Sequence, residues 1–175
     1  MNAATNIFNM KMDALMPERP FLSAIFFGLW LSLVTLSVSL IFAAIAEYFP
    51  GLSIDSSYTS GLEKLNYIDL FVICVLVGPL LETLVLQLFL IEVVRKFTAS
   101  KYSAIVLSAA AFGLGHYYHG GLSKSIPTFM TGLIFAYGYS QVRTKGIFTS
   151  YTVTGVAHVM HNFIALFVLA PIFDH

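Results

Sequence analysis

Apolar residues occur along this chain in five long runs, separated by short segments that hold most of the charged residues. The runs cover approximately residues 21–49, 67–94, 103–117, 126–139 and 148–170. A helix crosses the hydrocarbon core of a bilayer in about 20 residues, so the first two runs are long enough to cross it at a tilt. The third and fourth runs are shorter than about 18 residues and also suit re-entrant or buried helices. The pattern predicts an all-α, polytopic membrane helical bundle of about five transmembrane helices.

Hydrophobic residues make up 58% of the sequence and charged residues only 10%. A soluble domain has about 25% charged residues, so this chain cannot cover a water-facing surface, and a lipid bilayer is its expected surrounding. Nine basic and nine acidic residues give a net charge of zero, and no basic run indicates binding to nucleic acid. No repeat or linker divides the chain, so residues 1–175 are predicted to form a single integral-membrane domain.

The basic residues are sorted between the two sides of the predicted bundle. If five helices alternate in direction, one side receives Lys11, Arg19, Arg95, Lys96, Lys101, Arg143 and Lys145, and the other receives Lys64 and Lys124. Lys and Arg prefer cytoplasmic loops, so residues 1–20 and the N-terminus are predicted to be cytoplasmic and the C-terminus to lie on the opposite side. The first run exceeds the roughly 7–15 apolar residues of a signal peptide, which indicates an uncleaved anchor.

Four polar residues interrupt the apolar runs: Glu82, His116, His158 and Asn162. Polar and ionisable side chains are costly inside a bilayer and usually mark a functional site there. The carboxylate and the two histidines each lie 13 to 15 residues from a basic residue of the predicted cytoplasmic side. That separation corresponds to about 20 Å along a helix. Three helices therefore place costly side chains at one depth, which indicates one shared site.

The local spacing adds detail to this site. His158 and Asn162 are four residues apart, so both project from one face of a helix. Pro79 cannot donate a backbone hydrogen bond, and its ring clashes with the carbonyl one turn earlier, at Val75. We expect a kink just before Glu82 and a freed carbonyl that needs a partner. Irregular backbone is tolerated in a membrane where it lines a cavity, so the kink and the carboxylate indicate the same cavity.

A carboxylate, two imidazoles and an amide are sufficient for hydrolysis of a peptide bond. A carboxylate and an imidazole can together deprotonate a water molecule as a general base. A second imidazole and an amide can donate hydrogen bonds to the oxyanion that forms at the attacked carbonyl. The sequence contains neither Gly-x-Ser-x-Gly nor His-Glu-x-x-His, which would indicate a serine hydrolase or a zinc protease.

At these residues the chain resembles the CAAX prenyl protease type II and bacteriocin-processing family of intramembrane glutamic proteases. That family carries the motifs Glu-Glu-x-x-x-Arg, Phe-x-x-x-His and His-x-x-x-Asn (or Asp) on separate helices. The segments 112–116 and 158–162 match the second and third motifs in order, and Glu82 keeps the first glutamate of the first motif. The resemblance covers approximately residues 67–167.

The resemblance implies a role for each matched residue. Glu82 with His116 activates water, and His158 with Asn162 forms the oxyanion hole, while Phe112 supports the second motif. It also implies that no metal is needed. The expected substrate is a membrane-associated protein or peptide, such as a prenylated protein or a precursor.

The first motif departs from the family pattern at two positions, where Thr83 replaces the second glutamate and Gln87 replaces the arginine. Losing one partner of a buried ion pair leaves an unpaired charge and costs several kcal/mol, whereas losing both is benign. The two remaining side chains are four residues apart, where a neutral hydrogen bond can form. The departure therefore concerns substrate handling or the tuning of Glu82 rather than the presence of the general base.

Each polar residue taken singly also suits a structural role. Glu82 suits a protonated structural carboxyl, His116 an interfacial residue, and His158 a hydrogen-bonding group between helices. His119 and His161 each lie three residues from a motif histidine, and zinc held by two histidines and Glu82 is a minor alternative to a metal-free site. Two alternative functions are a non-catalytic immunity or chaperone-like membrane protein and a small transporter or proton relay.

Overall fold

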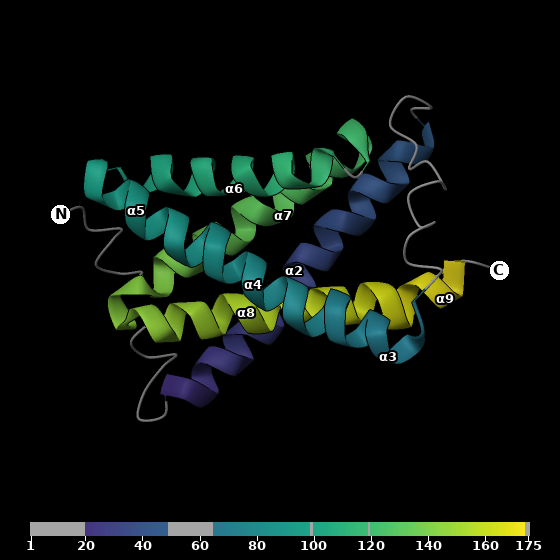
Figure 1. The fold of residues 1–175 in the computed structure, drawn as a ribbon, viewed down its shortest axis with the longest axis horizontal. Helices are drawn as coiled ribbons and strands as arrows, with labels where there is room; N and C mark the ends of the chain where they lie inside the picture. Colours follow the sequence, from purple (N-terminus) through teal and green to yellow (C-terminus); the bar gives the residue numbers. More distant parts are fainter. Residues whose placement is uncertain (1–19, 49–64, 99, 119, 174–175) are drawn as a thin grey trace.

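The computed structural model describes residues 20–48, 65–98, 100–118 and 120–173 (Figure 1). The elements within these ranges are helices, and none of the described residues forms a strand. Each of the five predicted runs corresponds to a helical stretch, so the expected all-α class is confirmed. The predicted cytoplasmic N-terminal segment lies outside the described residues.

Three of these stretches are single α-helices: α2 (Pro20–Tyr48), α6 (Lys101–Tyr117) and α7 (Gly121–Val142). The second stretch is built from α3 (Tyr67–Leu70), η3 (Phe71–Val77), α4 (Gly78–Glu82), η4 (Thr83–Phe89) and α5 (Leu90–Phe97). The last comprises α8 (Ile147–Phe163), η6 (Ile164–Leu169) and α9 (Ala170–Phe173), after the 3-10 turn η5 (Arg143–Lys145). The segments η3, η4 and η6 are π-helical, so their backbone N–H groups bond to the carbonyl five residues earlier.

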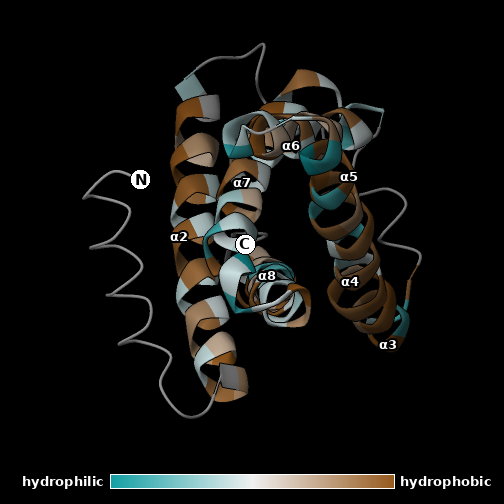
Figure 2. Cartoon of the chain, turned by 90° about the vertical axis from the view of Figure 1, so that its left-hand side faces the viewer, coloured by the Kyte–Doolittle hydropathy of each residue, from teal (hydrophilic) through white to brown (hydrophobic). Residues whose placement is uncertain are grey.

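Three helical stretches are long and apolar enough to cross a membrane: residues 21–45, 67–97 and 147–169. Hydrophobic colour covers most of α2 and of the stretch from α3 to α5 (Figure 2), and large apolar side chains such as Trp30 and Phe89 are exposed there. Soluble proteins rarely expose such continuous apolar surface, which instead suits contact with lipid. Helix α6 has only 17 residues, so the count of five spanning helices stays a prediction.

Helices α6 and α7 form a tightly packed hairpin. A Cβ atom added at Gly113 would lie 2.9 Å from the Cβ of Phe129, and one added at Gly132 would lie 2.9 Å from the ring of Phe112. Such close approach of two helices requires glycine at both positions. On the other side of the bundle, α8 lies between α2 and α4 (Figure 2). This arrangement places the second, third and fifth predicted helices around a common centre.

Helix α7 begins at Gly121 rather than at Ile126, where the apolar run begins. The reason is that polar side chains of its first turns are satisfied within the hairpin. The Ser125 hydroxyl donates to the backbone carbonyl of Gly113 at 3.0 Å. As a consequence Lys124, which the alternation of loops assigned to a connecting segment, belongs to the first turn of α7.

The end of the bundle opposite the α6–α7 turn is closed by an ion pair. The Arg143 guanidinium donates to both carboxylate oxygens of Glu92, at 2.5 and 3.0 Å, and the Tyr139 hydroxyl donates to the same carboxylate at 3.0 Å. These contacts connect α5 to the end of α7. Arg95, Lys96, Lys101 and Lys145 lie at the helix ends that meet here. This is therefore the basic end of the described bundle.

Candidate active site

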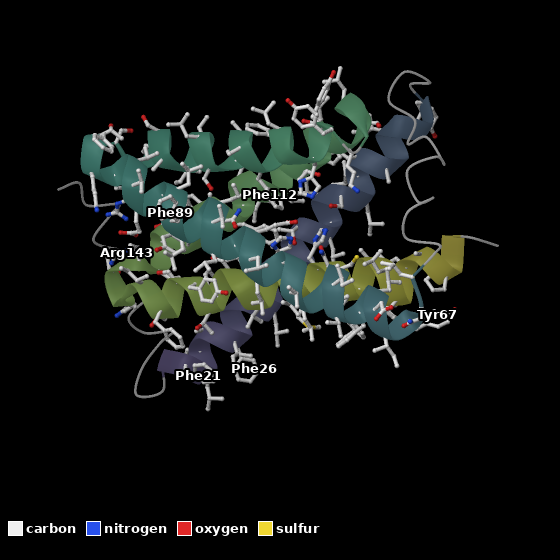
Figure 3. All side chains as sticks on the ribbon, in the orientation of Figure 1. Phe21, Phe26, Tyr67, Phe89, Phe112 and Arg143 are labelled. Atoms are coloured by element: carbon white, nitrogen blue, oxygen red, sulfur yellow. The ribbon has the colours of Figure 1, made fainter. Side chains whose placement is uncertain are left out.

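A cavity of about 410 Å³ lies among α6, α7, α8 and the helical stretch over residues 67–97. All four side chains that the sequence predicts as a site line it: Glu82, His116, His158 and Asn162. The cavity extends from the middle of the bundle toward the α6–α7 turn, since Lys124 in the first turn of α7 also lines it. In Figure 3, Phe112 of the cavity wall lies near the middle of the bundle, whereas Arg143 lies at its far, left-hand end.

His158 is the imidazole in direct contact with Glu82. Its Nε2 lies 3.6 Å from a carboxylate oxygen, which is electrostatic contact without a hydrogen bond of ordinary length. Its Nδ1 lies 3.3 Å from the Thr83 hydroxyl. The ring is buried between the rings of Phe112 and Phe135, whose centroids are 5.4 and 4.9 Å away. Packing therefore fixes the orientation of His158 beside the carboxylate.

His116 lines the same cavity from the last turn of α6. Its Nδ1 lies 2.9 Å from the backbone carbonyl of Phe112. A carbonyl oxygen can only accept, so Nδ1 carries the hydrogen, and Nε2 is the acceptor of the neutral ring. An imidazole in this tautomer can accept a hydrogen bond from water. The Glu82 carboxylate and the His116 imidazole are predicted to lie within about 6 Å of each other, since a single water must hydrogen-bond to both groups. This separation stays a prediction.

Asn162 satisfies the backbone carbonyl that Pro79 leaves without a donor. The sequence placed this carbonyl at Val75, on the assumption of an α-helical register, and that expectation is wrong. At the end of η3 the N–H of Gly78 bonds to the carbonyl of Ile73, five residues earlier. In the same register the next residue, Pro79, would bond to the carbonyl of Cys74, but proline has no N–H, so this carbonyl lacks a backbone donor. The Asn162 amide donates to the Cys74 carbonyl at 2.9 Å.

The expected hydrogen bond between Thr83 and Gln87 does not form. Both side chains are fully buried, yet the Gln87 amide nitrogen and oxygen have no hydrogen-bond partner among the described residues. The Thr83 hydroxyl instead faces His158. This position of the first motif thus supports the histidine of the third motif.

Two further side chains of the cavity were not assigned to a metal-free site from the sequence. Lys124 reaches the cavity from α7 and interacts electrostatically with Glu82. His161 lines the cavity from α8, and its Nδ1 lies 2.9 Å from the Thr35 hydroxyl of α2. The sequence pattern did not indicate that Lys124 lines the cavity, because the lysine precedes the apolar run. It reaches the cavity only because α7 begins before that run.

The described residues contain no group of three or more His, Cys, Asp or Glu side chains arranged to hold a metal ion. His119, which the zinc alternative invoked, lies outside the described residues. The cavity is lined by the Glu82 carboxylate and by several imidazoles, and those of His116 and His161 are already engaged with a backbone or side-chain partner.

Comparison with protein families reports a match to the model described as type II CAAX prenyl endopeptidase Rce1-like, over residues 64–164. This range contains the four side chains described above and agrees closely with the range of the resemblance seen in the sequence. Comparison with curated proteins and with solved structures gives no match.

Proposed function

Since the chain belongs to the Rce1-like family of type II CAAX prenyl endopeptidases, which the match over residues 64–164 shows, we propose that it is an intramembrane glutamic endopeptidase. Its substrate would be a membrane-associated protein or peptide, either prenylated or a precursor. One observation carries the proposal: four motif side chains from three helical stretches line one cavity inside an apolar bundle. An arrangement that gathers costly side chains at one place is typical of a functional site.

In the proposed reaction, Glu82 accepts a proton from a water molecule that the Nε2 atom of His116 helps to hold. The water oxygen attacks the carbonyl carbon of the scissile peptide bond. When the C–N bond breaks, the proton on Glu82 passes to the leaving nitrogen. The carboxylate is thereby restored, and no protein nucleophile or metal takes part.

The oxyanion would be stabilised by His158 and Asn162. An amide nitrogen carries two hydrogens, so Asn162 can donate one to the Cys74 carbonyl and retains the other for the oxyanion. With Thr83 donating to Nδ1 of His158, the ring hydrogen is on Nε2, which borders the cavity beside Glu82. The same imidazole therefore lies next to both the proposed base and the proposed oxyanion site.

The proposal is tested by reconstituting the purified protein in lipid vesicles with a library of membrane-derived and prenylated peptides, followed by mass spectrometry of the products. We expect cleavage at a defined peptide bond that persists after treatment with EDTA and 1,10-phenanthroline. If the chelators abolish cleavage and zinc restores it, the metal-free mechanism is wrong and the zinc alternative holds. If no peptide is cut, the protease function itself is not supported.

We also propose that the basic end of the bundle faces the cytoplasm, with the N-terminus on that side and the C-terminus opposite. Cys74 is the sole cysteine of the chain, so a Cys74→Ser background allows single cysteines to be introduced at positions 143 and 64. A membrane-impermeant thiol reagent added to intact cells should label position 64 and leave position 143 unlabelled until the membrane is permeabilised. Labelling at position 143 in intact cells would reverse the assignment.

A further inference from the structure

Lys124 brings a basic side chain into the cavity that holds Glu82. It is half-buried, lines the same cavity, and interacts electrostatically with the carboxylate. The adjacent Ser125 donates to the Gly113 carbonyl, and the close packing of Gly113 against Phe129 fixes α6 against α7. The lysine is therefore carried on a turn whose position the hairpin determines.

Titratable groups from each helix around the cavity line it together with Glu82: His158 and His161 from α8, His116 from α6, Lys124 from α7 and Cys74 from η3. Of these, His158 lies 3.6 Å from the Glu82 carboxylate. Histidine in water loses its proton near neutral pH, whereas lysine keeps its proton to about pH 10. Among these cavity groups, the Lys124 ammonium therefore starts from the highest pKa of any cationic form; burial lowers that pKa, and the neighbouring Glu82 carboxylate raises it.

A general base must be ionised before it can accept a proton. Removal from water favours the neutral, protonated form of a carboxyl group, and a protonated carboxyl cannot deprotonate water. A positive charge nearby favours the ionised form instead. Inside an apolar bundle, this balance decides whether Glu82 is able to act as a base.

We propose that Lys124 is a positioning residue for Glu82: its ammonium holds the side chain as a carboxylate, directed into the cavity and ready to accept a proton from water. The inference rests on the proposed protease function for its consequence in catalysis. The lysine makes and breaks no bond in this reaction, since it acts through Glu82. A methionine at this position keeps an unbranched side chain, one atom shorter than lysine, and removes its charge.

The first test is the pH profile of cleavage by Lys124→Met, Lys124→Arg and the control Lys101→Met, whose side chain lies at the basic end over the Tyr102 ring. Without the neighbouring cation a higher pH is needed to ionise Glu82, so the acid limb of the kcat profile should move upward by about 1 pH unit or more for Lys124→Met. Lys124→Arg and Lys101→Met should keep the profile of the unmodified protein. A loss that is equal at all pH values, or a change in KM alone, would overturn the inference.

The second test does not depend on catalysis and uses Cys74, which lines the same cavity. The rates at which this thiol reacts with an anionic and a cationic methanethiosulfonate reagent of similar size are compared in vesicles. Because local charge changes the local concentration of a charged reagent, Lys124→Met should lower the anionic-to-cationic rate ratio by at least about threefold, and Glu82→Gln should raise it. The ratio in Lys101→Met should equal that of the unmodified protein.

The two tests separate the inference from the protease function. An unchanged rate ratio in Lys124→Met overturns the inference, whatever the cleavage assay gives. If the ratio changes but the protein cleaves no peptide, the inference that Lys124 acts on the charge of Glu82 stands, and only the protease function is rejected.

Discussion

Replacing Glu82 by Gln should lower the rate of peptide cleavage at least about 100-fold. The substitution keeps the volume of the side chain and removes the group that accepts the proton from water. Folding should survive, because a neutral amide is cheaper in an apolar bundle than a carboxylate. The measurement is the initial rate of product formation under saturating substrate, with the amount of folded protein determined by size-exclusion chromatography in detergent.

Glu92→Gln is the matched control for this variant. It makes the same chemical change in the same helical stretch, but Glu92 pairs with Arg143 at the basic end and does not line the cavity. Its rate per folded molecule should equal that of the unmodified protein. Full cleavage by Glu82→Gln would contradict the mechanism. If this variant cleaves nothing but still binds the helix of a partner protein, the chaperone-like alternative is favoured. Ion or solute flux through vesicles would favour the transporter.

The second large effect is expected for Asn162→Ala, which should reduce kcat about 10²- to 10³-fold because an oxyanion donor is removed. The same change leaves the Cys74 carbonyl without its donor next to Pro79, so the free energy of unfolding should also fall by about 1–3 kcal/mol. Rates and thermal melts of the same preparation in detergent measure the two effects.

Asn66→Ala separates loss of stability from loss of the oxyanion donor. Asn66 caps α3 by accepting from the backbone N–H groups of Ile68 and Asp69, and it is exposed at the end of the bundle. Its removal should cost about 1 kcal/mol of stability and leave kcat unchanged. If Asn162→Ala melts earlier but cleaves at the normal rate, then Asn162 holds the backbone and contributes nothing to catalysis.

The hydrophobic pattern alone was sufficient for the class of fold. Apolar runs far longer than a buried strand can only be satisfied as helices when lipid surrounds them, because no water is present to bond with the backbone. The pattern was weaker for α7, where it missed the polar first turns. Those residues are helical because Ser125 finds a partner on α6, a contact that no local property of the sequence encodes.

The sequence also determined which side chains share the cavity. The number of residues between each side chain and the nearest basic residue predicted one membrane depth for Glu82, His116 and His158. Helical spacing placed Asn162 on the same face as His158. All four side chains line one cavity. Spacing succeeds on α8 because the segment that carries both residues is α-helical, so a separation of four residues is one turn.

Tertiary structure decided which of these side chains touch one another. The sequence paired Thr83 with Gln87, but the Thr83 hydroxyl lies against His158 instead. The sequence also freed the carbonyl of Val75, whereas the π-helical register of η3 moves the unpaired carbonyl to Cys74. The contact of His158 with Glu82 and the arrival of Lys124 depend on how three helical stretches rotate and slide against one another. A hydrophobic period fixes the face that a helix buries, but only close packing between helices fixes its register at the scale of a hydrogen bond.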